Sequence, residues 1–160
     1  MNRRSSVGVY AISRNDDVAV VYIKNPPHVW GTAYETFAAV AEAGVDVNMI
    51  IQTASAGAGA VDIIFAIDRK NAKETRTILE KLFAEYKDTE IRIDEKVAKI
   101  MVMGDEMQGK PGVAASVFRC LWNSEIHIIN ISASEIGISM LVNADEAEAA
   151  MECLNRDFRV

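Results

Sequence analysis

The order of apolar segments in the first half of this chain occurs again in the second half. Phe37 and Phe118 stand 81 positions apart in two helical patterns, and Val45 and Ile126 begin two strand patterns at the same offset. Each half reads strand, helix, strand, strand, helix, and one further strand per half would complete a split βαβ, or ferredoxin-like, sandwich. We therefore predict an α+β fold of two tandem ferredoxin-like (βαββαβ) domains.

The apolar periodicity of the sequence places the individual elements. The expected strands cover residues 7–12, 18–23, 45–53, 61–67, 97–103, 126–132 and 136–142. The expected helices cover residues 32–43, 71–86, 113–122 and 145–158, with Gly44 ending the first and Asn143 or Asp145 capping the last. Residues 13–17 read as a turn cluster, and residues 54–60 as a hairpin loop.

The two repeats differ in where their last strand comes from. Residues 90–93 can complete the first repeat, whereas no segment after the last helix is left to complete the second. The N-terminal strand, residues 7–12, fills that gap if it crosses into the second sheet. The expected domains are therefore residues 13–94 and residues 95–160, the second completed by residues 7–12.

Composition and charge exclude several classes of function. The net charge is −6 without a basic block, which argues against nucleic acid as a partner. No apolar run has the roughly 18 residues of a membrane span, and residues 1–4 lead into no signal sequence. We expect a soluble, cytoplasmic protein. Cys120 and Cys153 lie in apolar helical patterns, so we interpret them as buried hydrophobic residues rather than as a disulfide or zinc ligands, and expect no metal or cofactor.

The sequence offers little for catalysis. His28 and His127 have no Ser or Cys nucleophile at a recognisable spacing. The glycines of residues 56–60 lie between two strands rather than before a helix, so they do not form a phosphate-binding loop. We predict a chain that is not an enzyme by itself.

The positive signal is the pairing of each loop before a helix with the strand after that helix. In a split βαβ unit these two segments meet at one end of the sheet. The amides of Val113 and Ala114, after the turn at Pro111 and Gly112, would suit a carboxylate. Side chains with suitable acceptors for an ammonium group are Asn25, Gln52, Gln108, Ser132, Ser134 and Glu135. The alternative is that Gln52 and the serines are only the polar faces of half-buried strands, and spacing alone does not separate the two.

Several segments resemble the regulatory ACT-domain pair of aspartate kinase. In the second repeat they are residues 96–104, Met107, residues 111–113, residues 131–136 (Ile-Ser-Ala-Ser-Glu-Ile) and residues 138–139. In the first repeat they are residues 44–52 and 62–65. The resemblance covers nearly the whole chain. It implies a homodimer that binds lysine or threonine at interfaces between ACT domains, for feedback control of aspartate-family amino-acid synthesis, and a catalytic subunit as a possible partner.

Site residues follow from the same resemblance. The first site would use Asn25, Gln52 and the backbone of His127 and Ile128. The second would use residues 108–114, which include Gln108, Gly112, Val113 and Ala114, together with Ser132 and Ser134. The first site departs from the family pattern, because Asn25 replaces the usual Asp, His127 replaces the usual Asn, and residues 24–31 form a longer loop with Pro26 and Pro27.

Two other functions are consistent with this fold. One is a free-standing amino-acid sensor that regulates a different partner protein. The other is a small enzyme such as an acylphosphatase, which needs an Arg and an Asn at a phosphate loop that no loop-to-helix junction here offers. The regulatory module remains the leading hypothesis.

Overall fold

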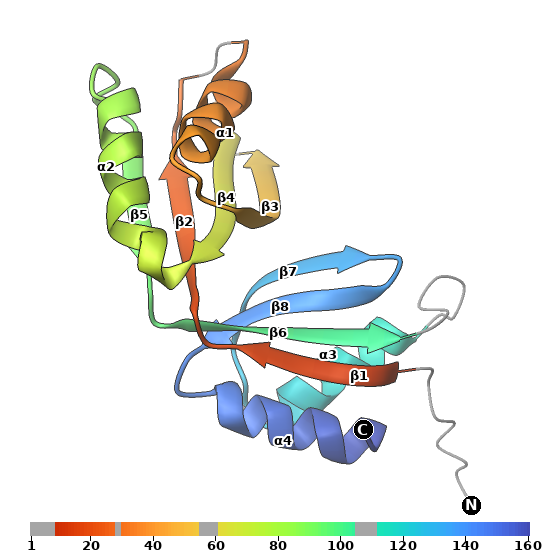
Figure 1. Ribbon diagram of the computed structural model, residues 1–160. Coiled ribbons are helices and arrows are strands. Elements are labelled where there is room, and N and C mark those ends of the chain that lie inside the picture. Colours follow the sequence, from red (N-terminus) through yellow and green to blue (C-terminus); the bar gives the residue numbers. More distant parts are fainter. Residues whose placement is uncertain (1–8, 28–29, 55–60, 105–111) are drawn as a thin grey trace, which may run out of the picture. The chain divides into compact units, whose positions relative to one another are not determined.

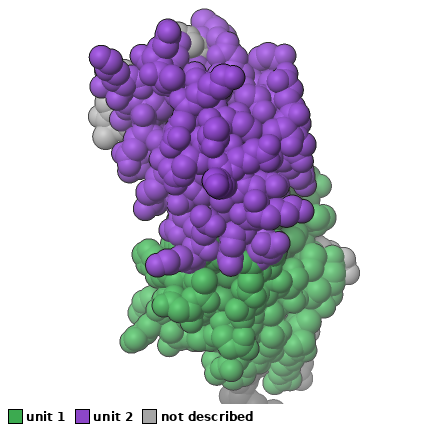
Figure 2. Space-filling model, turned by 60° about the vertical axis from the view of Figure 1, so that its left-hand side comes forward, with its two compact units in different colours: residues 1–16, 97–160 green, residues 17–96 purple. Residues whose placement is uncertain are grey.

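A computed structural model describes residues 9–27, 30–54, 61–104 and 112–160 of the chain. The chain divides into two compact units (Figure 2). Unit 1 comprises residues 1–16 and 97–160, and unit 2 comprises residues 17–96. Each unit is a four-stranded antiparallel sheet with two helices (Figure 1).

Unit 2 has the complete βαββαβ order within one stretch of chain. Its elements are β2 (Val18–Lys24), α1 (Thr32–Glu42), β3 (Val47–Ala54), β4 (Val61–Asp68), a 3₁₀ turn (Arg69–Asn71), α2 (Ala72–Leu82) and β5 (Glu90–Asp94). The sheet order is β3-β4-β2-β5, which is the ferredoxin-like order. The two strands joined by α1, β2 and β3, therefore lie on either side of β4 and do not pair with each other.

The core of unit 2 forms where α1 and α2 cover one face of this sheet. Strand β2 is buried from Val18 to Ile23, as expected for a central β-branched strand. Phe65 of β4 meets Phe37 of α1 edge to face, with ring centroids 5.3 Å apart, and Leu79 of α2 is fully buried beside them. Helix α1 ends before Gly44, whose left-handed φ of 72° stops the helix as predicted.

Unit 1 has the same arrangement but takes its last strand from the N-terminus. Its elements are β1 (Val9–Asn15), β6 (Val97–Gly104), α3 (Val113–Asn123), β7 (Ile128–Ser134), β8 (Gly137–Asn143) and α4 (Ala147–Phe158). The sheet order is β1-β6-β8-β7, so β1 stands at the edge that β5 occupies in unit 2. The predicted crossing of the N-terminal strand into the second sheet is confirmed.

Arg14 links β1 to α4 through an ion pair within unit 1. Its Nε donates to Asp16 Oδ1 at 2.7 Å, and its Nη1 donates to Glu148 Oε2 of α4 at 2.6 Å. These are exposed ion pairs, and such pairs contribute little to folding free energy. Apolar packing holds β1 more strongly, because Val9 and Ile12 of this strand pack against the buried core of the unit.

Several element boundaries differ from the prediction. Strand β1 continues through Asn15, because Ser13 to Asn15 pair with β6 and are not a turn. The residue before α4 is Glu146, so neither Asn143 nor Asp145 is the cap; instead the Asn143 side chain donates to Glu146 Oε2. Helix α2 ends at Leu82, and β7 begins at Ile128. Among the residues described, no helix has both the length and the apolar content to span a bilayer.

Candidate functional site

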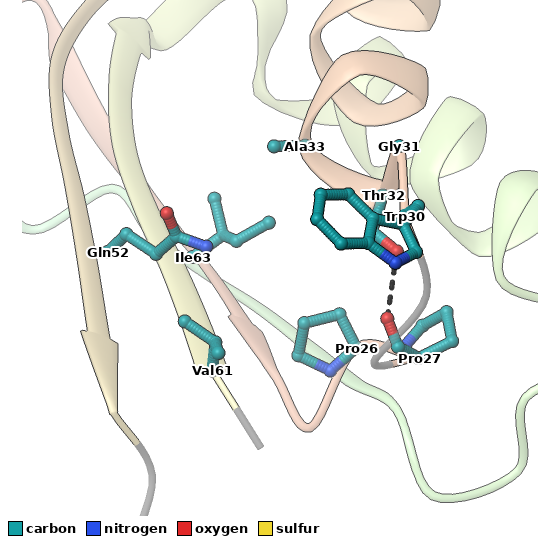
Figure 3. A pocket seen from close by; sticks show the side chains of 9 residues that line it. All are labelled: Pro26, Pro27, Trp30, Gly31, Thr32, Ala33, Gln52, Val61 and Ile63. Atoms are coloured by element: carbon teal, nitrogen blue, oxygen red, sulfur yellow. Dashed lines mark hydrogen bonds between the residues drawn. The ribbon is translucent and has the colours of Figure 1, made fainter. Parts of the chain in front are cut away.

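A cavity of about 480 Å³ opens in unit 2 between the start of α1, the end of β3 and the start of β4 (Figure 3). Its volume lies in the range of small-molecule sites. The lining residues are Pro26, Pro27, Trp30, Gly31, Thr32, Ala33, Gln52, Val61 and Ile63. The cavity thus combines the loop before the first helix with the strand after that helix, which is the pairing that the sequence predicted.

The loop supplies one wall because of how α1 begins. Gly31 precedes the helix with φ 97°, and its carbonyl accepts the first helical hydrogen bond from Glu35 N–H at 2.8 Å. No side chain of the described residues caps this end, and α-helix geometry leaves the first-turn amides, such as that of Ala33, without an acceptor inside the helix. The Thr32 hydroxyl donates to the Pro27 carbonyl at 2.8 Å and holds the loop against the helix. Such a helix start suits a carboxylate.

The opposite wall is the helix-facing side of the sheet. Gln52 of β3 lies directly across from Ile63 of β4, so both point to the same face, and Val61 lies two residues before Ile63 on that face. Figure 3 shows the Gln52 amide reaching from β3 toward the prolines and Trp30. The predicted candidate Gln52 therefore lies in the cavity.

Asn25 does not share this cavity. It lines a separate hollow with residues 85–89, and of the described residues only Pro27 lines both. Its backbone makes two hydrogen bonds: the Asn25 N–H donates to Asp62 Oδ1 at 3.0 Å, and its carbonyl accepts from the Thr89 hydroxyl at 3.0 Å. The structure thus places Asn25 and Gln52, which the sequence analysis grouped together, at different hollows.

In unit 1 the position equivalent to Gln52 is Ala133. Ala133 lies 81 positions after Gln52 and faces Ile138 of β8, as Gln52 faces Ile63 of β4. Both isoleucines belong to the cores under the helices. Unit 1 therefore has a methyl group where unit 2 has an amide.

The two candidate serines lie on the other face of unit 1. Ser132 pairs with Ser139 and Ser134 with Gly137, so both alternate with Ala133 and point away from α3 and α4. The Ser134 hydroxyl donates to the Gly137 carbonyl at 3.3 Å. The structure does not bring these side chains to the start of α3.

The remaining candidates also have definite places. Gly112 precedes α3 with φ 102°, Val113 is buried, and Ala114 is exposed in the first turn. His127 precedes β7 rather than lying in it, and its N–H donates to Glu146 Oε1 at 3.3 Å. The candidate Ile128 packs against the core of unit 1. Gln108 lies outside the described residues.

Neither cysteine contributes to a site. Cys120 of α3 and Cys153 of α4 are buried in the core of unit 1. The pKa of Cys120 is raised mainly by this burial and secondly by the neighbouring Cys153 thiol. A thiol whose pKa is raised is a poor nucleophile near neutral pH. Within the described part of the chain, no three His, Cys, Asp or Glu side chains gather as a metal site requires.

Comparison with known proteins identifies the fold family. A family model described as the ACT domain matches the chain twice, at residues 25–83 and 100–158. The chain belongs to the ACT domain family. Each match falls within one structural unit, so units 2 and 1 are the first and second ACT domains.

The tandem pair of ACT domains is similar to chains from solved aspartate kinase structures. The regulatory subunit of aspartate kinase from Thermus thermophilus, in its ligand-free form, superimposes with a TM-score of 0.87 at 28% identity, over 94% of this chain and 99% of that one. A chain from a structure of aspartokinase alpha and beta subunits gives a TM-score of 0.84 at 33% identity, over 95% and 99%. An aspartokinase of Corynebacterium glutamicum is 32% identical over 154 residues, which are 96% of this chain and 36% of that protein. The chain thus spans about a third of the length of the curated relatives it matches.

Several cavity residues of the first ACT domain were not predicted from the sequence. In the sequence, Pro26 and Pro27 indicate only a loop, and Val61 and Ile63 only a strand. Trp30 had no predicted role. The repeat offset contained a usable signal, because Trp30 stands where the second repeat has Pro111, 81 positions later. A large aromatic residue in place of a proline beside a candidate site marks a changed lining.

Proposed function

We propose that this chain is the amino-acid-binding regulatory part of an aspartate kinase. In this proposal it binds lysine or threonine at interfaces between ACT domains and thereby controls the kinase by feedback. The observation that carries the proposal is the superposition of both ACT domains, over 94% of the chain, on nearly the whole of an aspartate kinase regulatory subunit.

The cavity of the first ACT domain supports amino-acid binding on chemical grounds. A free amino acid carries a carboxylate, and the uncapped start of α1 offers first-turn amides to an anion. Its ammonium group needs acceptors, and the Gln52 side-chain oxygen offers one within the same cavity. These groups line the same cavity, and the carboxylate and ammonium of an amino acid are both attached to one carbon atom.

Regulation requires more than binding. An effector shifts the equilibrium between two kinase conformations only to the extent that it binds one of them more tightly. We propose that ligand in the first ACT domain favours one orientation of α1 and its preceding loop, and that a second copy of the chain completes the sites through the backbone near His127 and Ile128. The partners are then another copy of this chain and an aspartate kinase catalytic subunit or domain.

Calorimetry and co-purification test this proposal together. We expect lysine or threonine to bind at micromolar to millimolar concentration, the chain to run as a dimer in light scattering, and an aspartate kinase catalytic subunit from the same organism to co-purify with it. Capture of an unrelated protein instead of the kinase would favour a free-standing sensor. A monomer that binds no amino acid would contradict the proposal.

A further inference from the structure

The cavity of the first ACT domain is lined almost wholly by apolar groups. Most of its wall consists of Pro26, Pro27, Val61, Ile63 and the indole of Trp30. The described lining contains no Asp, Glu, Lys, Arg or His side chain. Of its two polar side chains, Thr32 already donates its hydroxyl to the Pro27 carbonyl, so Gln52 supplies the amide that faces the cavity.

This lining has a consequence for the side chain of a bound amino acid. A ligand ammonium group that leaves water needs a carboxylate or several good acceptors, and its transfer is otherwise costly. The nearest carboxylate on β4, Asp62, alternates with Val61 and Ile63 and accepts a hydrogen bond from the Asn25 N–H. Gln52 and the start of α1 suffice for the backbone charges of an amino acid, but the described lining holds no partner for a second positive charge.

Trp30 adds apolar surface to the cavity, and its indole is not packed in the protein core. The indole lines the cavity yet is fully exposed to solvent, with a relative accessibility of 103%. Figure 3 shows it on the wall across from Gln52 and Val61. Exposed aromatic side chains at a cavity gain most when a ligand covers them, because burial removes their surface from water.

We propose that this cavity selects a free amino acid with an uncharged, apolar side chain, of the size of methionine, leucine or isoleucine, over lysine. The inference rests on the amino-acid binding of the proposed function, and for the first site alone it replaces lysine or threonine by an apolar ligand. The ligand carboxylate lies at the start of α1 and its ammonium at Gln52. Its side chain packs between the indole of Trp30 and Val61. Threonine fits the charge requirement but leaves most of the apolar wall uncovered.

The test uses Trp30 as its own reporter. The chain has two tryptophans, so Trp122→Phe, at an exposed position of α3 in the other unit, leaves Trp30 as the only indole. Methionine, leucine, isoleucine, threonine and lysine are titrated separately while emission is recorded. We expect a saturable blue shift with methionine, leucine or isoleucine, and at least tenfold weaker binding of lysine.

Two variants measured by calorimetry locate the contact. Trp30→Ala should weaken binding of the apolar amino acid by about tenfold, as expected for a buried aromatic anchor. Trp122→Ala is the matched control, since it removes an exposed indole elsewhere and should leave the affinity unchanged. Equal loss in both variants, or no loss in Trp30→Ala, would overturn the assignment of this wall.

The outcomes separate this inference from the proposed function. Saturable binding of lysine in place of the apolar amino acids, weakened by Gln52→Ala, would overturn the inference and leave the proposed function standing. Absence of binding by every amino acid, in emission and in calorimetry, would overturn both.

Discussion

Gly31 and Gly112 adopt the same left-handed backbone conformation at the same position of the two ACT domains. Gly31 has φ 97° and ψ −8° before α1, and Gly112 has φ 102° and ψ −8° before α3. They are 81 positions apart. In both domains the chain therefore enters the helix through a left-handed glycine, and among the described residues no side chain caps either helix.

This conformation predicts the effect of adding a side chain. A Cβ at Gly31 or Gly112 would meet no atom of the described residues within 4 Å, so we expect the cost of Gly31→Ala or Gly112→Ala to be backbone strain, about 1–2 kcal/mol of unfolding free energy each. Gly31→Asn should cost less, because asparagine tolerates the left-handed region better than alanine. Urea unfolding of the three variants measures this. Equal losses for Gly31→Ala and Gly31→Asn would show that strain is not the cause.

Thr75 of α2 offers a stabilising substitution. It is fully buried, and its hydroxyl has no hydrogen-bond partner among the described residues. A buried hydroxyl without a partner costs free energy, and valine has nearly the same shape without that group. Thr75→Val should raise the unfolding free energy by about 1 kcal/mol. Thr77→Val is a control at an exposed position whose hydroxyl donates to the Lys73 carbonyl at 3.1 Å, and it should not stabilise the protein.

The buried thiol of Cys120 predicts both reactivity and pH dependence. Burial raises the pKa of Cys120 above its ordinary value of 9.0, with the Cys153 thiol as a second cause. The folded protein thus holds this proton more tightly than the unfolded chain, so the contribution to stability is complete below about pH 9 and falls as the pH rises further. Chemical unfolding between pH 7 and pH 10 should show this decline, and Cys120→Ala should flatten it.

A thiol-specific reagent gives an independent check on the cysteines. At pH 8 both thiols should react slowly in the folded protein and rapidly in urea, because both are buried. Fast labelling of either cysteine without denaturant would contradict the packing of α3 against α4.

Gln52 is the side chain on which the first site most depends. Gln52→Ala should weaken any amino acid bound in the first ACT domain by roughly tenfold or more, since a hydrogen bond to a charged group contributes about 1.5–3 kcal/mol. Thr53→Ala, the next residue of β3, alternates to the opposite face and is the matched control. Calorimetry compares the two with the wild type. Unchanged affinity in Gln52→Ala would show that the first cavity is not the binding site.

Periodicity was enough for the sheet and helix order but not for every boundary. The buried strand β2, the four helices and the crossing of β1 follow from apolar patterns and from counting the strands each repeat needs. Ser13 to Asn15 have the composition of a turn, yet they continue β1 because tertiary pairing with β6 outweighs local propensity. The start of α4 was missed because Asn143 is the last residue of β8, and a turn after it places Glu146 at the N-cap position and Ala147 at the first helical one.

Only part of the site was predicted, because the sequence does not show which face of a strand each side chain occupies. Gln52 lies in the cavity, whereas Ser132 and Ser134 lie on the opposite face from the position that matches Gln52. A shift of one residue moves every side chain of a strand to the other face, and strand β7 has a register irregularity between Ile128 and Asn130. The repeat offset of 81 residues points to Ala133 as the match of Gln52, and the strand pairing shows that Ala133 faces Ile138 as Gln52 faces Ile63. The apolar lining depends on tertiary proximity of Trp30 and Val61, which no spacing encodes.

The most direct measurement is calorimetric titration of each standard amino acid into the wild-type chain. We predict saturable heat for a small set of amino acids, with at least one of them binding at the cavity beside Gln52. No measurable heat for any amino acid, with the protein folded throughout, would contradict amino-acid binding by this chain.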